Sequence, residues 1–124
     1  MTSELRIASV DDVVQWYGKV PATMKAVLML IDGKPVAIGG MMRKNGLNVA
    51  FMDMKPDASS APFSVWKGTM KAMKEIISHS RMPVYAQVSE ELPTAPAFLR
   101  RLGFVPVDEK EEVMVCQVQQ QEYP

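Results

Sequence analysis

Few residues in this sequence have the type and spacing that metal binding or nucleophilic catalysis requires. The chain of 124 residues contains one histidine, His79, and one cysteine, Cys116. A single cysteine cannot close an internal disulfide, and the paired His and Cys spacings of metal sites are absent. We therefore expect no metal. His79 falls at the end of a predicted helix, where an imidazolium complements the helix dipole, and Cys116 is expected to be a small core residue.

Two other side chains could take part in proton transfer. Asp53 lies near the end of a predicted strand, where its carboxylate could act as a general base. A solvent-facing carboxylate without a catalytic role is the alternative. Tyr85 lies on a later predicted strand, and its hydroxyl could act as a general acid, while a packed core tyrosine is the alternative. The sequence alone leaves both pairs of hypotheses open.

The composition limits the class of protein. Lys and Arg number 14 and Asp and Glu number 14, so the formal net charge is zero. This balance argues against a general nucleic-acid binder and against a polybasic membrane anchor, since both carry a basic excess. The longest apolar run, Ala26–Ile31, is too short to cross a bilayer, and the first residues do not resemble a secretory signal. We expect a cytoplasmic protein with one domain over residues 1–118 and a polar tail over residues 119–124.

The elements that must position these residues follow from hydrophobic periodicity and turn signals. Ser9 and Asp12 have the spacing of a capping box, and Asp32-Gly33 and Asn45-Gly46 predict two hairpins. The predicted order is β-α-β-β-β-α-β-α-β-β: Leu5–Ile7, a helix from Ser9 to Gly18, Lys25–Ile31, Pro35–Met42, Leu47–Met54, a long helix from Pro62 to His79, Pro83–Val88, Ala95–Leu102, Phe104–Val107 and Val113–Val118. On the long helix, an apolar stripe predicts the core-facing side: Phe63, Trp66, Met70, Met73 and Ile77.

This order, together with Ala95-x-x-Phe98-Leu99-x-x-x-Gly103-Phe104, resembles the GCN5-related N-acetyltransferase (GNAT) family. The hairpin at Asp32-Gly33 that leads into Val36–Gly40 is similar to the second and third strands of that family. The resemblance implies an α+β, three-layer fold, with a mixed, mostly antiparallel twisted sheet of 6–7 strands and helices on both faces. The family's usual second helix is shortened or missing between Gly18 and Lys25.

The resemblance also implies a function, the transfer of an acyl group from acetyl-CoA to a primary amine. The strands Leu47–Met54 and Pro83–Val88 would run in parallel and splay apart, and the pantetheine arm would pair with the exposed backbone near Met52 and Met54. The pyrophosphate would lie at the start of the long helix, where free N–H groups and the helix dipole favour anions. Ser89, Thr94 and Arg100 are further candidate contacts of the cofactor.

The sequence departs from the family pattern where the phosphates would bind. Ser59, Pro62 and Ser64 fall on the positions of an Arg and two Gly in the family's loop. Pro62 has no N–H to donate, although the hydroxyls of Ser59, Ser60 and Ser64 could replace some of the lost contacts. Leu99 falls on the position of the family's usual Tyr acid, and loss of a general acid typically lowers the rate about 10²- to 10⁴-fold.

Two functions from different classes follow. The first is an acyl-CoA-dependent N-acyltransferase with a degenerate pyrophosphate loop, whose partners are acyl-CoA and an amine acceptor. The second is a catalytically silent GNAT-fold protein used for binding or assembly, with a protein partner or as a homodimer. Small bacteriophage proteins, including internal virion proteins, are similar in length and in the hairpin ending Ala37-Ile38-Gly39-Gly40, which would place the chain in a virion.

Overall fold

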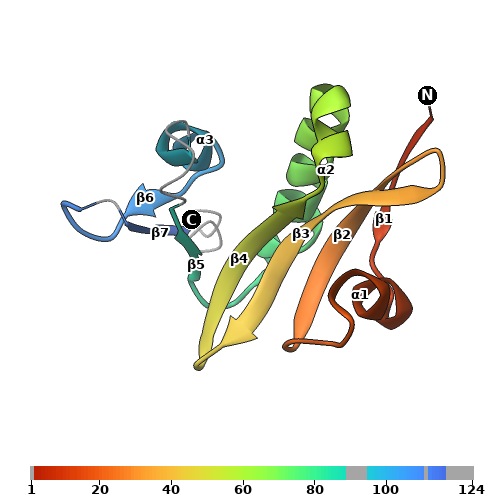
Figure 1. Ribbon diagram of the computed structural model, residues 1–124. Helices are drawn as coiled ribbons and strands as arrows, with labels where there is room; N and C mark the ends of the chain where they lie inside the picture. Colours follow the sequence, from red (N-terminus) through yellow and green to blue (C-terminus); the bar gives the residue numbers. More distant parts are fainter. Residues whose placement is uncertain (1, 89–94, 111, 117–124) are drawn as a thin grey trace.

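One seven-stranded sheet organises the chain, and the strands follow the order β1-β2-β3-β4-β5-β7-β6 (Figure 1). The computed structural model describes residues 2–88, 95–110 and 112–116. The strands are β1 Ser3–Ile7, β2 Met24–Ile31, β3 Lys34–Lys44, β4 Leu47–Met54, β5 Val84–Gln87, β6 Val105–Pro106 and β7 Val113–Cys116. The helices are α1 Val10–Tyr17, α2 Pro62–Glu75 and α3 Ala95–Arg101, with the 3-10 helices η1 Pro56–Ser60 and η2 Ile77–His79. The predicted order and fold class are confirmed.

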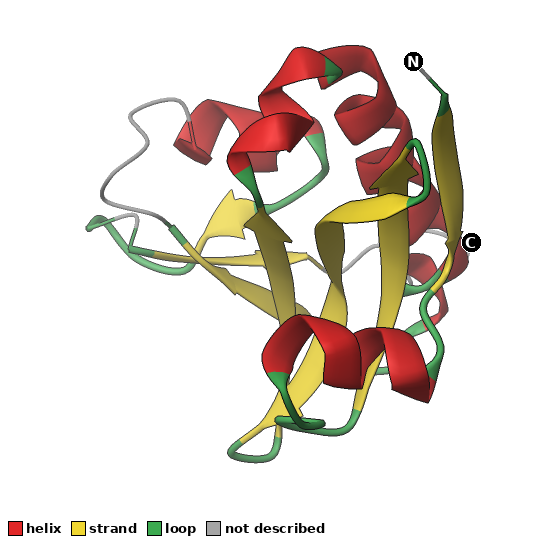
Figure 2. Cartoon of the chain, turned by 45° about the vertical axis from the view of Figure 1, so that its right-hand side comes forward, coloured by secondary structure: helices red, strands yellow, loops and turns green. Residues whose placement is uncertain are grey.

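The helices α1 and α2 cover opposite faces of the sheet (Figure 2). Successive side chains of a strand point to opposite faces, and β2 shows this alternation. Leu28 packs with Val13 of α1, whereas Val27 packs with Ala72 of α2. Cys116 is buried on the α2 face, as the sequence predicts. We refer below to the α1 face and the α2 face of the sheet.

The first helix begins where the sequence predicts. The Ser9 hydroxyl accepts the backbone N–H of Asp12 at 3.1 Å, and the Asp12 carboxylate accepts the backbone N–H of Ser9 at 2.9 Å. These hydrogen bonds, with an ion pair to Arg6 at 2.9 Å, hold the pKa of Asp12 below its usual value. The helix ends at Gly18, which adopts a positive φ of 82°. No helix forms between Gly18 and the start of β2.

The predicted core stripe of α2 is partly wrong: Met73 and Ile77 pack in the core as predicted, but Phe63 and Met70 do not. Phe63 is 69% exposed and Met70 is 43% exposed, while Ile77 lies beyond the helix in η2. The helix instead turns its small residues toward the sheet, since Ala72 is buried and a Cβ added at Gly68 would lie 3.1 Å from Leu5. Small side chains let the helix approach the strands closely, which displaces its bulky residues to the flanks and to solvent.

Gly40 allows β2 and β3 to approach each other. A Cβ at this position would lie 2.2 Å from the backbone oxygen of Lys25 and 2.8 Å from the Cα of Ala26. Both of these atoms belong to the backbone of β2, which cannot rotate away. The sequence pair Gly39-Gly40 predicts either a bulge or a close approach, and the structure shows the approach here and the bulge elsewhere, between Met29 and Leu30 of β2.

We expect Gly40→Ala to lower the free energy of unfolding by about 3 kcal/mol, because the added methyl group forces the two strands apart. Gly68→Ala is the matched control, since its methyl group meets only the flexible end of Leu5 and the helix gains propensity. Urea unfolding followed by circular dichroism measures both variants. Equal stability of Gly40→Ala and the wild type would contradict this account of the strand contact.

Candidate functional site

The pairing between β4 and β5 stops after two residue pairs. Asn48 pairs with Val84 and Val49 pairs with Tyr85, in the one parallel ladder among the described strands. Beyond these pairs β4 continues to Met54 along β3, while β5 continues to Gln87 along β7. Figure 1 shows the two strands diverging from this point, with α2 and α3 above the gap. The sheet therefore opens between two neighbouring strands, as the resemblance implies.

The last part of β4 presents a free backbone edge to this opening. The N–H of Lys55 donates to the carbonyl of Val36 at 2.8 Å, so Lys55 points its backbone groups toward β3. Backbone groups alternate in direction along an antiparallel strand. The N–H and C=O groups of Met52 and Met54 therefore point away from β3, toward the opening. An extended ligand arm can pair with such an edge as an added strand would.

A groove of about 430 Å³ lies at the end of β4, where the chain enters α2. It is lined by Met54, Lys55, Pro56, Ala58, Ser59, Pro62 and Val65. The 3-10 helix η1 forms its wall and is anchored by the buried side chain of Ala58. The groove thus joins the free edge of β4 to the first turn of α2.

Asp53 lies on the α1 face, where its carboxylate accepts a hydrogen bond from the hydroxyl of Tyr17 on α1. Partial burial raises the pKa of the Tyr17 hydroxyl above its usual value, and the hydrogen bond and charge of Asp53 add to this shift. The two residues lie 36 positions apart in the sequence. The sequence analysis missed Tyr17, although its place at the end of α1 could have identified it as a residue facing β4.

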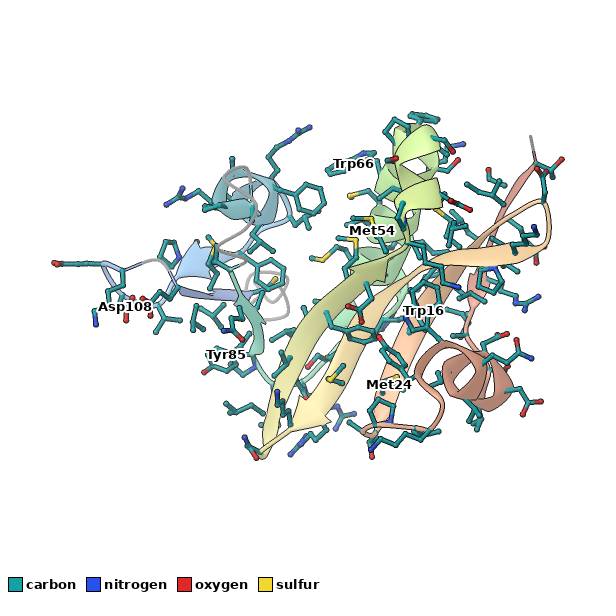
Figure 3. All side chains as sticks on the ribbon, in the orientation of Figure 1. Trp16, Met24, Met54, Trp66, Tyr85 and Asp108 are labelled. Carbon is teal, nitrogen blue, oxygen red and sulfur yellow. The ribbon has the colours of Figure 1, made fainter. Side chains whose placement is uncertain are left out.

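Tyr85 lies on β5 at the last residue pair before the opening (Figure 3). Its neighbours Val84 and Ala86 are buried on the α2 face, so the alternation of a strand places Tyr85 on the α1 face. Asp53 is on the same face but four residues beyond Val49, the partner of Tyr85. Four residues of extended strand cover roughly 13 Å. The structure thus places the two candidate catalytic residues on one face without bringing them into contact.

An aromatic contact joins α2 and α3 beside the opening between β4 and β5. The ring centroids of Trp66 and Phe98 are 5.7 Å apart, and the guanidinium of Arg101 lies 5.0 Å from the centroid of Trp66. Figure 3 shows Trp66 on α2 and Met54 on β4 at the border of the opening. Arg100, the predicted nucleotide contact, is exposed beside Arg101 on α3. Ser89 and Thr94 lie outside the residues that the structure describes.

Several solved acetyltransferases share this fold. The ribosomal-protein-S18-alanine N-acetyltransferase from Escherichia coli matches with a TM-score of 0.67 and 12% identity, over 93% of each chain. The chain has the fold of the GCN5-related N-acetyltransferases. AtaTR bound with AcCoA matches with a TM-score of 0.61 and 12% identity, over 97% of this chain and 96% of that one. The aminoglycoside acetyltransferase AAC(6')-Ib in complex with coenzyme A matches with a TM-score of 0.59 and 13% identity, over 99% of this chain and 100% of that one. No protein-family model and no curated protein matches the sequence.

The start of α2, where the GNAT resemblance implies a pyrophosphate, offers few free donors. A helix normally leaves its first four N–H groups without partners inside the helix. Here Pro62 has no N–H, and the N–H of the capping residue Ala61 donates to the carbonyl of Ala58 at 3.1 Å. The N–H of Val65 makes the first regular bond of the helix, to the carbonyl of Ala61, and is not one of the four. At most Phe63 and Ser64 can offer backbone N–H groups to an anion.

The three serines of this GNAT-like loop already have hydrogen-bond partners. The hydroxyl of Ser59 donates to the carbonyl of Pro56 at 2.7 Å, and that of Ser60 donates to the carbonyl of Asp57 at 2.8 Å. The hydroxyl of Ser64 shares a hydrogen bond of 3.0 Å with that of Ser3. Each hydroxyl has a single hydrogen, so binding a phosphate oxygen requires Ser59 and Ser60 to break these bonds.

The residues that the structure describes contain neither a metal-binding cluster nor a membrane-spanning helix. No three or more His, Cys, Asp or Glu side chains there come together in a way that could hold a metal ion. Among the same residues, none of the helices combines the length and apolarity needed to cross a bilayer.

We expect the Tyr17 hydroxyl to ionise at higher pH than an ordinary tyrosine, for which the pKa is 10.0. Absorbance at 295 nm against pH should show a late step that is absent from Tyr17→Phe and that moves to lower pH in Asp53→Asn. The raised pKa stabilises the fold below pH 10, and this contribution decreases as the pH rises above 10. A step near pH 10 that is lost in Tyr17→Phe and unchanged in Asp53→Asn would contradict the Tyr17–Asp53 hydrogen bond.

Proposed function

We propose that this protein is an acyl-CoA-dependent N-acyltransferase that transfers an acyl group to a primary amine. The observation that carries the proposal is the opening between β4 and β5 after two residue pairs, directly before the turn into α2. The fold is that of proteins solved with acetyl-CoA or coenzyme A, which supports the proposal.

The pantetheine arm is proposed to lie along the free edge of β4. It carries two amide groups, and the backbone groups of Met52 and Met54 that face the opening provide donors and acceptors for them. The side chains of Met52 and Met54 are 41% and 50% exposed and lie on the α2 face, where they would cover the apolar parts of the arm. This position directs the thioester into the opening.

In the proposed reaction, Asp53 accepts the proton of the ammonium group of the acceptor. The amine nitrogen then attacks the thioester carbonyl, so that a C–N bond forms, the C–S bond breaks, the nitrogen releases its second proton to solvent water and coenzyme A leaves as a thiolate. Tyr85 is the proposed donor of the proton that the thiolate takes up. Tyr17 acts as a positioning residue, because its hydrogen bond fixes the carboxylate of Asp53. The raised pKa of Tyr17 keeps that hydroxyl protonated and able to donate.

The phosphates are proposed to bind at the first turn of α2, with contacts from Ser59, Ser60 and Ser64. Arg100 would meet the nucleotide end of the cofactor. Ser89 and Thr94 keep their proposed role at the arm, on residues that the structure does not describe. Because Pro62 and the bonds within η1 remove donors, we expect a lower affinity for acetyl-CoA than a complete cradle would give.

A second function has its own support. The loss of donors at α2 and the presence of Leu99 in place of a tyrosine favour a catalytically silent descendant of the fold that binds a protein partner or a second copy of itself. The two functions differ in one measurable property, the binding of acetyl-CoA.

Calorimetric titration of the protein with acetyl-CoA tests the proposal. We expect saturable heat and a rise in melting temperature at millimolar ligand, because a ligand that binds the folded state stabilises it. Absence of both signals at that concentration would reject the acyltransferase function and leave the binding function.

Met52→Pro tests the free edge directly. Proline removes the N–H that faces the opening and spares the hydrogen bonds between β3 and β4. Loss of one hydrogen bond of about 0.5–1.5 kcal/mol should weaken acetyl-CoA binding about two- to tenfold. Met52→Ala, which keeps the N–H, is the control for the lost side chain. If both variants bind equally, the arm does not pair with this edge.

A further inference from the structure

Two aromatic rings, a carboxylate and an ammonium group meet at the end of α1. The rings of Trp16 and Tyr17 are in edge-to-face contact with centroids 6.5 Å apart, and the Tyr17 hydroxyl donates to Asp53. The ammonium group of Lys55 lies 4.8 Å from the centroid of Trp16. A cation at this distance from an indole ring is attracted by the negative charge of the ring face. The corner therefore already accommodates an alkylammonium group.

We infer that Trp16, Tyr17 and Asp53 form the binding site for the ammonium group of the acceptor, and that Lys55 covers the Trp16 side of this site in the free protein. The acceptor class is an unbranched alkylammonium group, such as a lysine side chain or a polyamine end. This inference rests on the proposed function and names the substrate of its site.

The electrostatics of the corner favour a cation. The C-terminal end of a helix carries a partial negative charge, and the last turn of α1, which contains Trp16 and Tyr17, has no basic residue. Lys19 follows after the C-cap. One oxygen of Asp53 accepts the Tyr17 hydrogen bond, and the exposed carboxylate keeps further acceptor capacity for an ammonium group.

Rigid supports hold the three residues in place. Trp16 and Tyr17 pack on the core of the α1 face, next to Val13 and Phe51. Asp53 lies opposite Ile38 of β3, so its backbone is fixed within the sheet. Lys55 is tied to the sheet by one backbone hydrogen bond and reaches Trp16 with a flexible side chain. An incoming ammonium group can displace this side chain without moving the backbone.

The location also suits an acceptor of the proposed reaction. Asp53 lies between Met52 and Met54, whose backbone groups face the opening where the thioester arm is proposed to lie. An amine bound at Asp53 on the α1 face therefore approaches the thioester from the face opposite α2. The side chain of Lys55 shows that a four-carbon stem reaches Trp16 from the adjacent strand end.

Titration with n-butylammonium chloride at constant ionic strength tests the inference without coenzyme A. The probe is the indole N–H resonance of Trp16, assigned by its loss in Trp16→Phe, and n-butanol is the neutral control. We expect a saturable shift with n-butylammonium only. Lys55→Met should lower the dissociation constant about two- to fivefold, because the internal competitor is removed. Lys34→Met, the same change at an exposed lysine on β3, should leave the constant unchanged.

Three results would each overturn the inference: no shift with n-butylammonium in the wild type and in Lys55→Met, an equal response to n-butanol, or unchanged affinity in Asp53→Asn. Failure of the acyltransferase proposal would show itself separately, as absence of acetyl-CoA binding by calorimetry. The two experiments use different ligands, so failure of either proposal can be recognised without the other.

Discussion

The short parallel ladder between β4 and β5 is the constraint on which the rest of the structure depends. Each of these strands is paired along its whole length with its other neighbour. β4 pairs with β3 through eight residue pairs and β5 pairs with β7 through four, whereas only two pairs join β4 to β5. Since the two halves of the sheet are held by their outer ladders, closing the gap would require one of these ladders to shift. The opening is thus built into the sheet and does not depend on a mobile loop.

An open edge inside a sheet leaves backbone groups without partners in the sheet. Such groups must bind water or a ligand, because an unpaired and buried N–H or C=O is costly. The exposed side chains at the end of β4 agree with a hydrated edge. The free N–H and C=O groups at this edge can therefore pair with an extended molecule that carries amide groups. This property belongs to the fold and is independent of whether catalysis occurs.

Local signals in the sequence predicted most of the fold but only part of the site. Ser9 and Asp12 act within one turn, and Gly40 marks a contact between adjacent strands, so both are visible in a single sequence. The face of α2 was mispredicted because Phe63 and Met70 have the right spacing but the wrong size for close packing, and size is set by the partner surface. The pairing of Tyr17 with Asp53 joins residues 36 positions apart, and no local pattern encodes such a contact.

The phosphate end and the acceptor end of the proposed site differ in how well they suit their ligands. At the start of α2, Pro62 and the bonds within η1 satisfy or remove donors that a polyanion would use. At the end of α1, the Lys55 ammonium lies over the ring of Trp16, which contacts Tyr17, and the Tyr17 hydroxyl donates to the carboxylate of Asp53. A scaffold that binds no small ligand does not require an exposed carboxylate held by a tyrosine beside an aromatic surface. The polarity of the α1 face is therefore the feature that favours the proposed acyltransferase over a scaffold, since a scaffold requires only the sheet and its helices.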